Sequence, residues 1–328
     1  MILRRNTHKR TSIFYLDFNF SVKYFYEDNS LCYEHSLLYL LIVSQSLNMI
    51  TASEIAPSPV LAPFVRCYCY REFDTNGFDL IKPWHASHEI SMPFFFKAKP
   101  VQLIDPATGQ ILQRGGYGGV TGLATQYNGE MTFNGCYSFF EILFKPNGFN
   151  KIFRLPSSEI TNQIIHGDDI FDTRIKIFYE QLCMANDLKE MASLADTYLL
   201  YYFKKQKSIH HKDAITNISN LILKNAGFIN IDKLAYDANM SIRNFERHFI
   251  EQVGISPKLY CCITRFSHAL SLKLMNPEKD WTSIAFECGY FDQMHLIKDF
   301  KKFAGSSPSI FLRQTPLTDE NYTSRVDV

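Results

Sequence analysis

The chain has 328 residues, of which 46% are hydrophobic and 20% charged, and its formal net charge is +1. This length suits about two domains with real hydrophobic cores, which excludes a disordered chain. The near-neutral balance excludes a protein that binds nucleic acid through bulk positive charge.

The first 48 residues lack clear organisation. The segment MILRRNTHKR is basic, but the apolar run at residues 37–43 is too short for a membrane span and too far downstream for a secretory signal, so no membrane partner is expected. We predict that Met49 is the true start and that residues 1–48 are upstream sequence read in the same frame. N-terminal sequencing of the native protein tests this, and a mature chain that begins at Met1 would contradict it.

Residues 49–203 are predicted to form a β-rich domain that ends in helices. Short alternating runs separated by Gly, Pro and Asn predict strands at residues 64–70, 89–96, 101–104 and 137–144. Many short strands indicate a barrel or a sandwich. Helical spacing then runs from residue 172 to 203, with an apolar stripe that must be buried. We expect this stripe to pack on the strands of its own chain, with a homodimer interface through residues 172–203 as the alternative.

The cysteines and histidines of this region do not predict a metal site. The chain has eight cysteines without a CxxC pair, which indicates free buried thiols in a reducing cytoplasm. Cys67 and Cys69 would lie on one face of a strand, but two ligands alone do not make a zinc site. The run from Trp84 to Glu89 has neither the HExxH order nor an HxH spacing. No metal and no cofactor are therefore expected.

Residues 204–213 are polar and predict a linker, and residues 214–314 contain one unit twice. Copies that begin at Ile229 and Asp280 align once an extra residue is allowed in the second turn. The matched pairs are Ala235 with Ala285, Phe249 with Phe300, Gly254 with Gly305, and Ser256-Pro257 with Ser307-Pro308. Each copy is typical of a helix-turn-helix, and two copies make a duplicated module and not a solenoid. Residues 315–328 are predicted to be a polar tail.

A long helix is predicted between the two copies. Ser256 can cap it, Pro257 suits its first position, and it continues to about Met275. A rod of this length measures about 30 Å, close to the ~34 Å of one turn of DNA. One chain could therefore place two recognition helices in successive segments of the major groove.

The second helix of each copy has an outward face with side chains suited to base edges. In the first copy Ile242, Phe245, Phe249 and Val253 are expected to point inward. The predicted DNA contacts are Arg243, Asn244, Glu246 and Arg247 in the first copy and Gln293, Met294, Ile297 and Lys298 in the second. A solvated helix face is the alternative for each helix alone, and repetition of the whole unit favours DNA. Residues 210–317 carry 13 Lys and Arg against 10 Asp and Glu, so affinity must come from the placement of charge.

The second copy resembles the signature of the AraC/XylS transcriptional regulators. The residues that carry this likeness are Ala285-x-x-Cys288-Gly289-Tyr290-x(9)-Phe300-Lys301-Lys302-x-x-Gly305-x-Ser307-Pro308. The first copy is similar, and the resemblance covers about residues 213–313. It implies a double helix-turn-helix, with DNA contacts at the eight positions above. Met294 and Ile297 are apolar where the family commonly has polar residues, so the first copy is expected to supply most of the base specificity.

The strand-rich region is similar, more weakly, to the sensor or dimerisation domains that precede this module. One stretch, from Leu143 to Thr161, resembles an uncharacterised domain found in a subset of the family. Together the resemblances imply an α+β chain that acts in the cytoplasm as a transcription factor and activator. Its expected partners are double-stranded DNA, RNA polymerase and a small-molecule effector.

Two other functions stay open at this point. The protein could be a regulator without a ligand, controlled by its abundance or by a protein partner. It could also be a DNA-modifying enzyme that carries this module, but no cysteine lies in a reactive Pro-Cys setting beside a base. We therefore expect no catalytic residues and no enzymatic activity.

Overall fold

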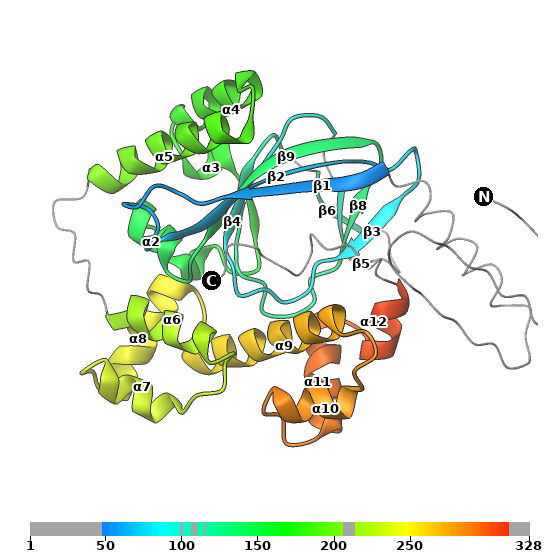
Figure 1. Ribbon diagram of the computed structural model, residues 1–328. Helices are drawn as coiled ribbons and strands as arrows, with labels where there is room; N and C mark the ends of the chain where they lie inside the picture. The colour runs from blue at the N-terminus through cyan, green and yellow to red at the C-terminus, as the bar shows by residue number, and fades with distance from the viewer. Residues whose placement is uncertain (1–47, 99–100, 106–109, 115, 206–213, 315–328) are drawn as a thin grey trace, which may run out of the picture. The chain divides into compact units, whose positions relative to one another are not determined.

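The computed structural model describes residues 48–98, 101–105, 110–114, 116–205 and 214–314 (Figure 1). The chain divides into two compact units, Met1–Ser44 and Gln45–Val328. All residues that the structure describes lie in the second unit. The predictions for residues 1–47, for most of the linker and for the C-terminal tail concern residues outside these ranges. Among the described helices, none is long and apolar enough to cross a membrane.

Two antiparallel sheets form the N-terminal region. The first has the order β1 (Asn48–Ile55), β2 (Val65–Asp74), β9 (Cys136–Phe144), β4 (Ser91–Phe95), β7 (Gly119–Thr121) and β10 (Ile164–His166). The second has the order β3 (Leu80–Pro83), β8 (Glu130–Phe133), β5 (Val101–Asp105) and β6 (Gln110–Arg114). The four predicted strands are confirmed as β2, β4, β5 and β9. Strand β2 ends at a turn in which the Asp74 carboxylate accepts from the Asn76 amide and Gly77 has φ +80°.

Helices follow the strands, as the change of periodicity predicts. They are α2 (Gly148–Phe153), the 3₁₀ turn η1 (Ser157–Glu159), α3 (Gly167–Ile170), α4 (Arg174–Met184) and α5 (Leu188–Lys204). The apolar stripe packs on the sheet of its own chain, since the Phe178 ring lies 5.1 Å from that of Phe94 and the Tyr68 hydroxyl donates to Asp196 at 2.7 Å. This confirms the first expectation for the stripe. A homodimer through residues 172–203 stays a prediction.

The C-terminal region is all helical, which confirms the α+β class. Its helices are α6 (Ala214–Lys224), α7 (Ile231–Asp237), α8 (Ile242–Val253), α9 (Pro257–Met275), α10 (Trp281–Glu287), α11 (Gln293–Ala304) and α12 (Pro308–Gln314). Figure 1 shows α9 between the group α6 to α8 and the group α10 to α12. The 19 residues of α9 span about 28 Å. The predicted long helix between the two copies is therefore present.

The two copies share their helix caps as well as their apolar positions. Asn230 and Asp280 accept amide hydrogens at the start of α7 and α10, and Ser241 and Asp292 do the same for α8 and α11. Each recognition helix ends at a glycine in the left-handed region. These caps fix the first and last turns of both helices at matching points.

The inward face predicted for the first recognition helix is wrong at one residue. Phe245, Phe249 and Val253 are buried, but Ile242 is 52% exposed. Ile242 is the first residue of α8, and a helical side chain leans toward the turn before its own Cα. Because no turn of α8 precedes Ile242, its side chain has no helical surface beside it through which to reach the core.

Candidate nucleic-acid interface

The first recognition helix presents its predicted contact residues to solvent. Arg243, Glu246 and Arg247 are exposed, and Asn244 is half-buried. The Asn244 side-chain oxygen accepts from Arg247 Nη2 at 2.9 Å. This bond holds the guanidinium along the outer face of the helix, so Asn244 orients Arg247 as well as offering an amide of its own.

The second recognition helix presents a less charged face. Gln293, Met294 and Lys298 are exposed, and Ile297 is half-buried. The Gln293 side-chain oxygen accepts from the Thr282 hydroxyl at 3.2 Å, which ties the start of α11 to α10. The wall of one surface depression is formed by Phe291, Asp292, Met294, His295, Ile297, Lys298 and Lys301. The eight predicted contacts therefore fall into two sets of unlike chemistry, one on each helix.

The two helix-turn-helix units are joined through α9 and one half-buried arginine. The Arg265 guanidinium lies 5.4 Å from the centre of the Tyr290 ring in the second unit, and its Nη2 lies 3.5 Å from the Gly227 carbonyl oxygen beside the first. The Phe228 ring lies so close to Gly289 that a Cβ there would be 2.5 Å from it. These contacts fix the orientation of one unit relative to the other.

The N-terminal region contacts the C-terminal ends of both recognition helices. The Ser157 hydroxyl donates to the Gln252 carbonyl of α8 at 2.7 Å, and the Ala86 amide donates to the Phe303 carbonyl of α11 at 2.8 Å. Gln252 and Phe303 occupy equivalent positions in the two copies. The last carbonyls of a helix have no partner within it, so outside donors satisfy them here.

Two further contacts reinforce this arrangement. The Thr161 hydroxyl lies 3.0 Å from the Gly254 carbonyl oxygen, and the Tyr127 amide donates to the Lys302 carbonyl at 3.2 Å. The residues from the strand-rich region that make these bonds are Ala86, Tyr127, Ser157 and Thr161. Sequence reasoning missed all four, because nothing local marks a residue whose partner lies more than 90 positions away.

The histidines near the end of β3 contact α9. The His85 ring lies 6.0 Å from that of Phe266 and 6.2 Å from that of Phe311, and His88 Nδ1 lies 3.2 Å from the Ser267 hydroxyl. The run from Trp84 to Glu89 contributes to the packing between the strand-rich region and the helical domain.

Acidification is expected to weaken this packing through His85. Burial lowers the pKa of His85 below its ordinary value of 6.5, so below about pH 6.5 the unfolded chain takes up a proton that the folded chain resists. Stability is unaffected by this group above that pH and falls as the pH drops below it, by at most about 1.4 kcal/mol per pH unit. The measurement is the urea midpoint between pH 7.5 and 5.5. His85→Phe should flatten the decline, and an unchanged slope in that variant would show that another group is responsible.

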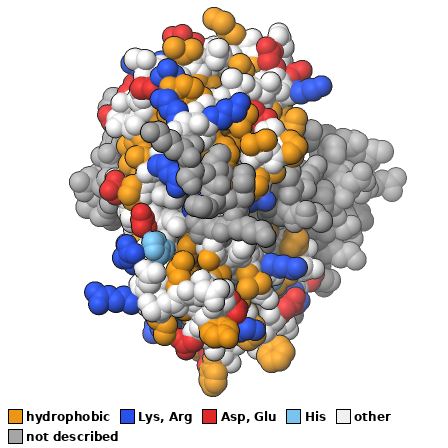
Figure 2. All heavy atoms as spheres, turned by 90° about the vertical axis from the view of Figure 1, so that its left-hand side faces the viewer, with side chains coloured by type: hydrophobic (Ala, Val, Ile, Leu, Met, Phe, Trp, Pro, Cys, Tyr) orange, Lys and Arg blue, Asp and Glu red, His pale blue; other side chains and the backbone are white. Residues whose placement is uncertain are grey.

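Charge is distributed without a single basic face on the side that Figure 2 displays. Basic, acidic and hydrophobic side chains are intermingled there. This fits the small excess of positive charge in the helical domain, and it leaves DNA affinity to side chains at particular positions.

Two family models match the chain. The helix-turn-helix domain model matches residues 234–314, and a domain of unknown function, DUF6597, matches residues 53–166. Over 87 residues the chain is 34% identical to an uncharacterized HTH-type transcriptional regulator from Haemophilus influenzae, covering 26% of this chain and 29% of the relative. Over 130 residues it is 28% identical to the HTH-type transcriptional activator RhaS from Escherichia coli, covering 38% of this chain and 46% of the relative.

The chain carries an AraC-type DNA-binding domain. The chain spans less than half the length of the curated relatives it matches. Among solved structures, ToxT from Vibrio cholerae is similar with a TM-score of 0.43 and 12% identity, over 83% of this chain and 99% of that chain. The AraC-like transcriptional activator CuxR has a TM-score of 0.22 and 10% identity, over 86% of this chain and 88% of that chain. The resemblance of residues 213–313 to the AraC/XylS regulators, which was inferred from the sequence, is therefore confirmed for this domain.

Proposed function

We propose that the protein is a sequence-specific transcription regulator whose AraC-type domain contacts two successive segments of the major groove. The observation that carries this proposal is the pair of equivalently capped recognition helices, joined by α9, which carry the eight predicted contact residues, six of them exposed and Asn244 and Ile297 half-buried. Arg243 and Arg247 are suited to guanine, Asn244 and Gln293 to adenine, Glu246 to cytosine, and Met294 and Ile297 to the thymine methyl group. Lys298 is suited to guanine or to a phosphate.

The two unlike faces favour a monomeric domain that binds an asymmetric site. The Arg-Asn-Glu-Arg set of α8 offers several polar contacts to bases, whereas the Met-Ile pair of α11 offers apolar ones. We infer that α8 supplies most of the base specificity and that α11 adds affinity and a preference for thymine.

The test is substitution of the arginines of α8. A binding site is first selected from randomised duplex DNA with the full-length protein. Arg243→Ala and Arg247→Ala are each expected to cost about 1–3 kcal/mol on that site and to relax specificity in one half of it only. Affinity is measured by fluorescence anisotropy on the selected site and on random DNA.

The matched control is Lys224→Ala. Lys224 is exposed at the end of α6, and its loss changes the charge by the same amount without altering the outward face of α8. It should leave sequence preference unchanged. Equal losses on selected and random DNA for an arginine variant would assign that arginine to a phosphate, and no loss in either variant would contradict the proposed interface.

We further propose that the N-terminal region controls the AraC-type domain. Support comes from the hydrogen bonds that its residues make to the last carbonyls of α8 and α11. A rearrangement in the strand-rich region would move or release both helix ends together. A small-molecule effector is the proposed signal, since the domain would then act as a sensor. A thermal-shift screen of the full-length protein against metabolites tests this, and intact DNA binding with no responsive metabolite would favour control by abundance or a protein partner.

The remaining roles belong to the same proposal. Because RhaS is an activator, we propose activation, contact with RNA polymerase and a cytoplasmic location for this protein also. An enzymatic role is not proposed. Burial raises the pKa of the Cys261 and Cys288 thiols to about 11, which suits packing and not nucleophilic attack.

A further inference from the structure

Three potential metal ligands meet on one face of the first sheet, far from the AraC-type domain in sequence. Cys67 and Cys69 are two residues apart on β2, so both side chains lie on the same face. Strand β1 pairs with β2 in a register that sets Glu54 directly opposite Cys69. The register of two strands therefore adds a carboxylate to the two thiols that the sequence alone places together.

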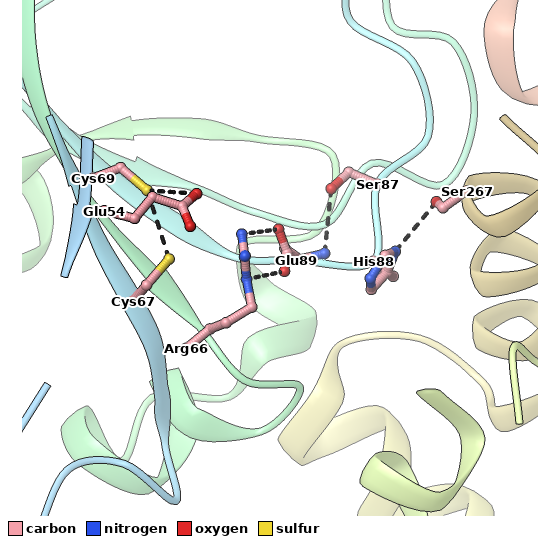
Figure 3. A network of polar contacts seen from close by, with 8 residues as sticks. All are labelled: Glu54, Arg66, Cys67, Cys69, Ser87, His88, Glu89 and Ser267. Atoms are coloured by element: carbon pink, nitrogen blue, oxygen red, sulfur yellow. Dashed lines mark hydrogen bonds and ion pairs between the residues drawn. The ribbon is translucent and has the colours of Figure 1, made fainter. Parts of the chain in front are cut away.

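The three side chains point toward one another (Figure 3). The Sγ atoms of Cys67 and Cys69 are 3.6 Å apart, and Cys69 Sγ lies 3.5 Å from Glu54 Oε1. One donor atom from each residue lies within 4.8 Å of the other two. Among the described residues, this is the group of His, Cys, Asp and Glu side chains that meets this geometric condition.

Two of the three spacings among these donor atoms match the edges of a coordination tetrahedron, and the third, between Cys67 Sγ and the Glu54 carboxylate, is at most 4.8 Å. With metal–sulfur bonds of about 2.3 Å and metal–oxygen bonds of about 2.0 Å, two sulfurs are about 3.8 Å apart, and a sulfur and an oxygen about 3.5 Å. The observed values of 3.6 and 3.5 Å are close to both. The three donor atoms are therefore spaced so that side-chain rotations can bring them around one cation.

The surroundings of the group suit a thiophilic cation. Cys67 and Cys69 are at most 1% exposed and pack with Leu143, whereas Glu54 is half-buried on the edge strand of the sheet. Soft thiolate ligands select zinc-like metals over magnesium or calcium. The half-buried carboxylate provides the more accessible side of the group, from which an ion could enter.

The charges beside the group are already balanced. Glu141 pairs with Cys69 from the other side, on β9, and its carboxylate forms an ion pair with Arg71 at 2.5 Å. The Glu54 carboxylate faces the two thiols from β1, with Oε1 at 3.5 Å from Cys69 Sγ (Figure 3). This arrangement makes Glu54 the third ligand.

We propose that Glu54, Cys67 and Cys69 bind one thiophilic divalent cation of the Zn²⁺ class, with a water molecule as fourth ligand. On binding, each thiol loses its proton to solvent, and two metal–sulfur bonds and one metal–oxygen bond replace bonds between the hydrated cation and its water molecules, one of which it keeps as the fourth ligand. The cation keeps its oxidation state, and the site carries a net charge of −1. This proposal concerns metal binding alone and holds whether or not the protein regulates transcription.

The test uses the full-length protein, reduced and freed of metal with a chelator. Zn²⁺ is titrated in competition with a chromophoric chelator, and Co²⁺ is added separately as a spectroscopic probe. We expect one equivalent of Zn²⁺ per chain. With Co²⁺ we expect a thiolate charge-transfer band together with the intense ligand-field bands of a tetrahedral site.

Variants assign the ligands. Cys67→Ser and Cys69→Ser are each expected to weaken Zn²⁺ binding by more than about tenfold, and Glu54→Gln to weaken it and alter the Co²⁺ ligand-field bands. The control Cys136→Ser with Cys183→Ser removes two exposed thiols and should bind as the parent does. Urea unfolding of each metal-free variant shows whether it is folded.

Several results would overturn the proposal. They are a wild-type stoichiometry well below one, a Co²⁺ spectrum without a thiolate band, unchanged affinity in both single cysteine variants, or loss of binding in the Cys136 and Cys183 control. The proposal would also be overturned if the reduced wild-type protein took up no metal and formed a Cys67–Cys69 disulfide in air. The wild-type measurements decide the matter even if a cysteine variant does not fold.

Discussion

Replacing Phe266 with alanine is expected to lower the free energy of unfolding by about 3–5 kcal/mol. Phe266 is 1% exposed in the middle of α9. Its ring lies 5.1 Å from that of Phe300 and 5.4 Å from that of Phe303, both in α11, and 6.0 Å from that of His85. Alanine would leave a cavity shared by the connecting helix, the second recognition helix and the strand-rich region.

Urea unfolding followed by circular dichroism measures this effect. Phe266→Leu retains most of the volume and should cost less than about 1.5 kcal/mol. Phe286→Ala removes an aromatic ring that is 87% exposed and should stay within about 0.5 kcal/mol of the parent. A loss for Phe266→Ala no larger than that for Phe286→Ala would contradict the packing of α9 described above.

The helical domain could be predicted in detail because its determinants are local and repeated. The caps Asn230 and Ser256 act within three residues of themselves, and the two copies identify each other's equivalent positions. Gly254 and Gly305 are matched in sequence and both end a recognition helix in the left-handed region. Ile242, whose inward orientation was predicted wrongly, lies at a helix start, where the apolar periodicity continues in the sequence but the helix does not.

The strand-rich region could be predicted only as a set of strands. Its order places β9 between β2 and β4, and β7 beside β4, which no alternation pattern specifies. The position of Glu54 opposite Cys69 depends on that pairing, since a register shift of one residue would turn Glu54 to the other face. The spacing of the two cysteines could therefore not predict Glu54 as the third ligand of the proposed metal site.

The contacts between the strand-rich region and the recognition helices could not be predicted from the sequence either. They join Ser157 to Gln252 and Ala86 to Phe303 through carbonyl oxygens. A carbonyl is present at every position of the chain, so the acceptor carries no sequence signal. Only the fold shows that the acceptors are the equivalent residues of the two copies.

Gly305→Ala is expected to destabilise the protein more than the same change at another glycine of similar conformation. Gly305 ends α11 with φ +77°, and a Cβ there would lie 2.7–2.9 Å from three carbons of the Tyr127 ring. The left-handed backbone alone costs an alanine roughly 1–2 kcal/mol, and the overpacking adds a further ~1–3 kcal/mol. Gly77 has φ +80° and no atom within 4 Å of its Cβ, so Gly77→Ala measures the backbone cost alone.

A double-mutant cycle separates the two costs for Gly305. If the Tyr127 ring causes the additional loss, Gly305→Ala should cost less in a Tyr127→Ala background than in the parent, and there resemble Gly77→Ala. The same variants test function, because a ring forced away from the end of α11 disturbs the Tyr127 amide that donates to the Lys302 carbonyl. DNA affinity should therefore fall in Gly305→Ala and not in Gly77→Ala. Equal unfolding costs for Gly305→Ala in both backgrounds would show that the strand-rich region does not hold the end of the second recognition helix.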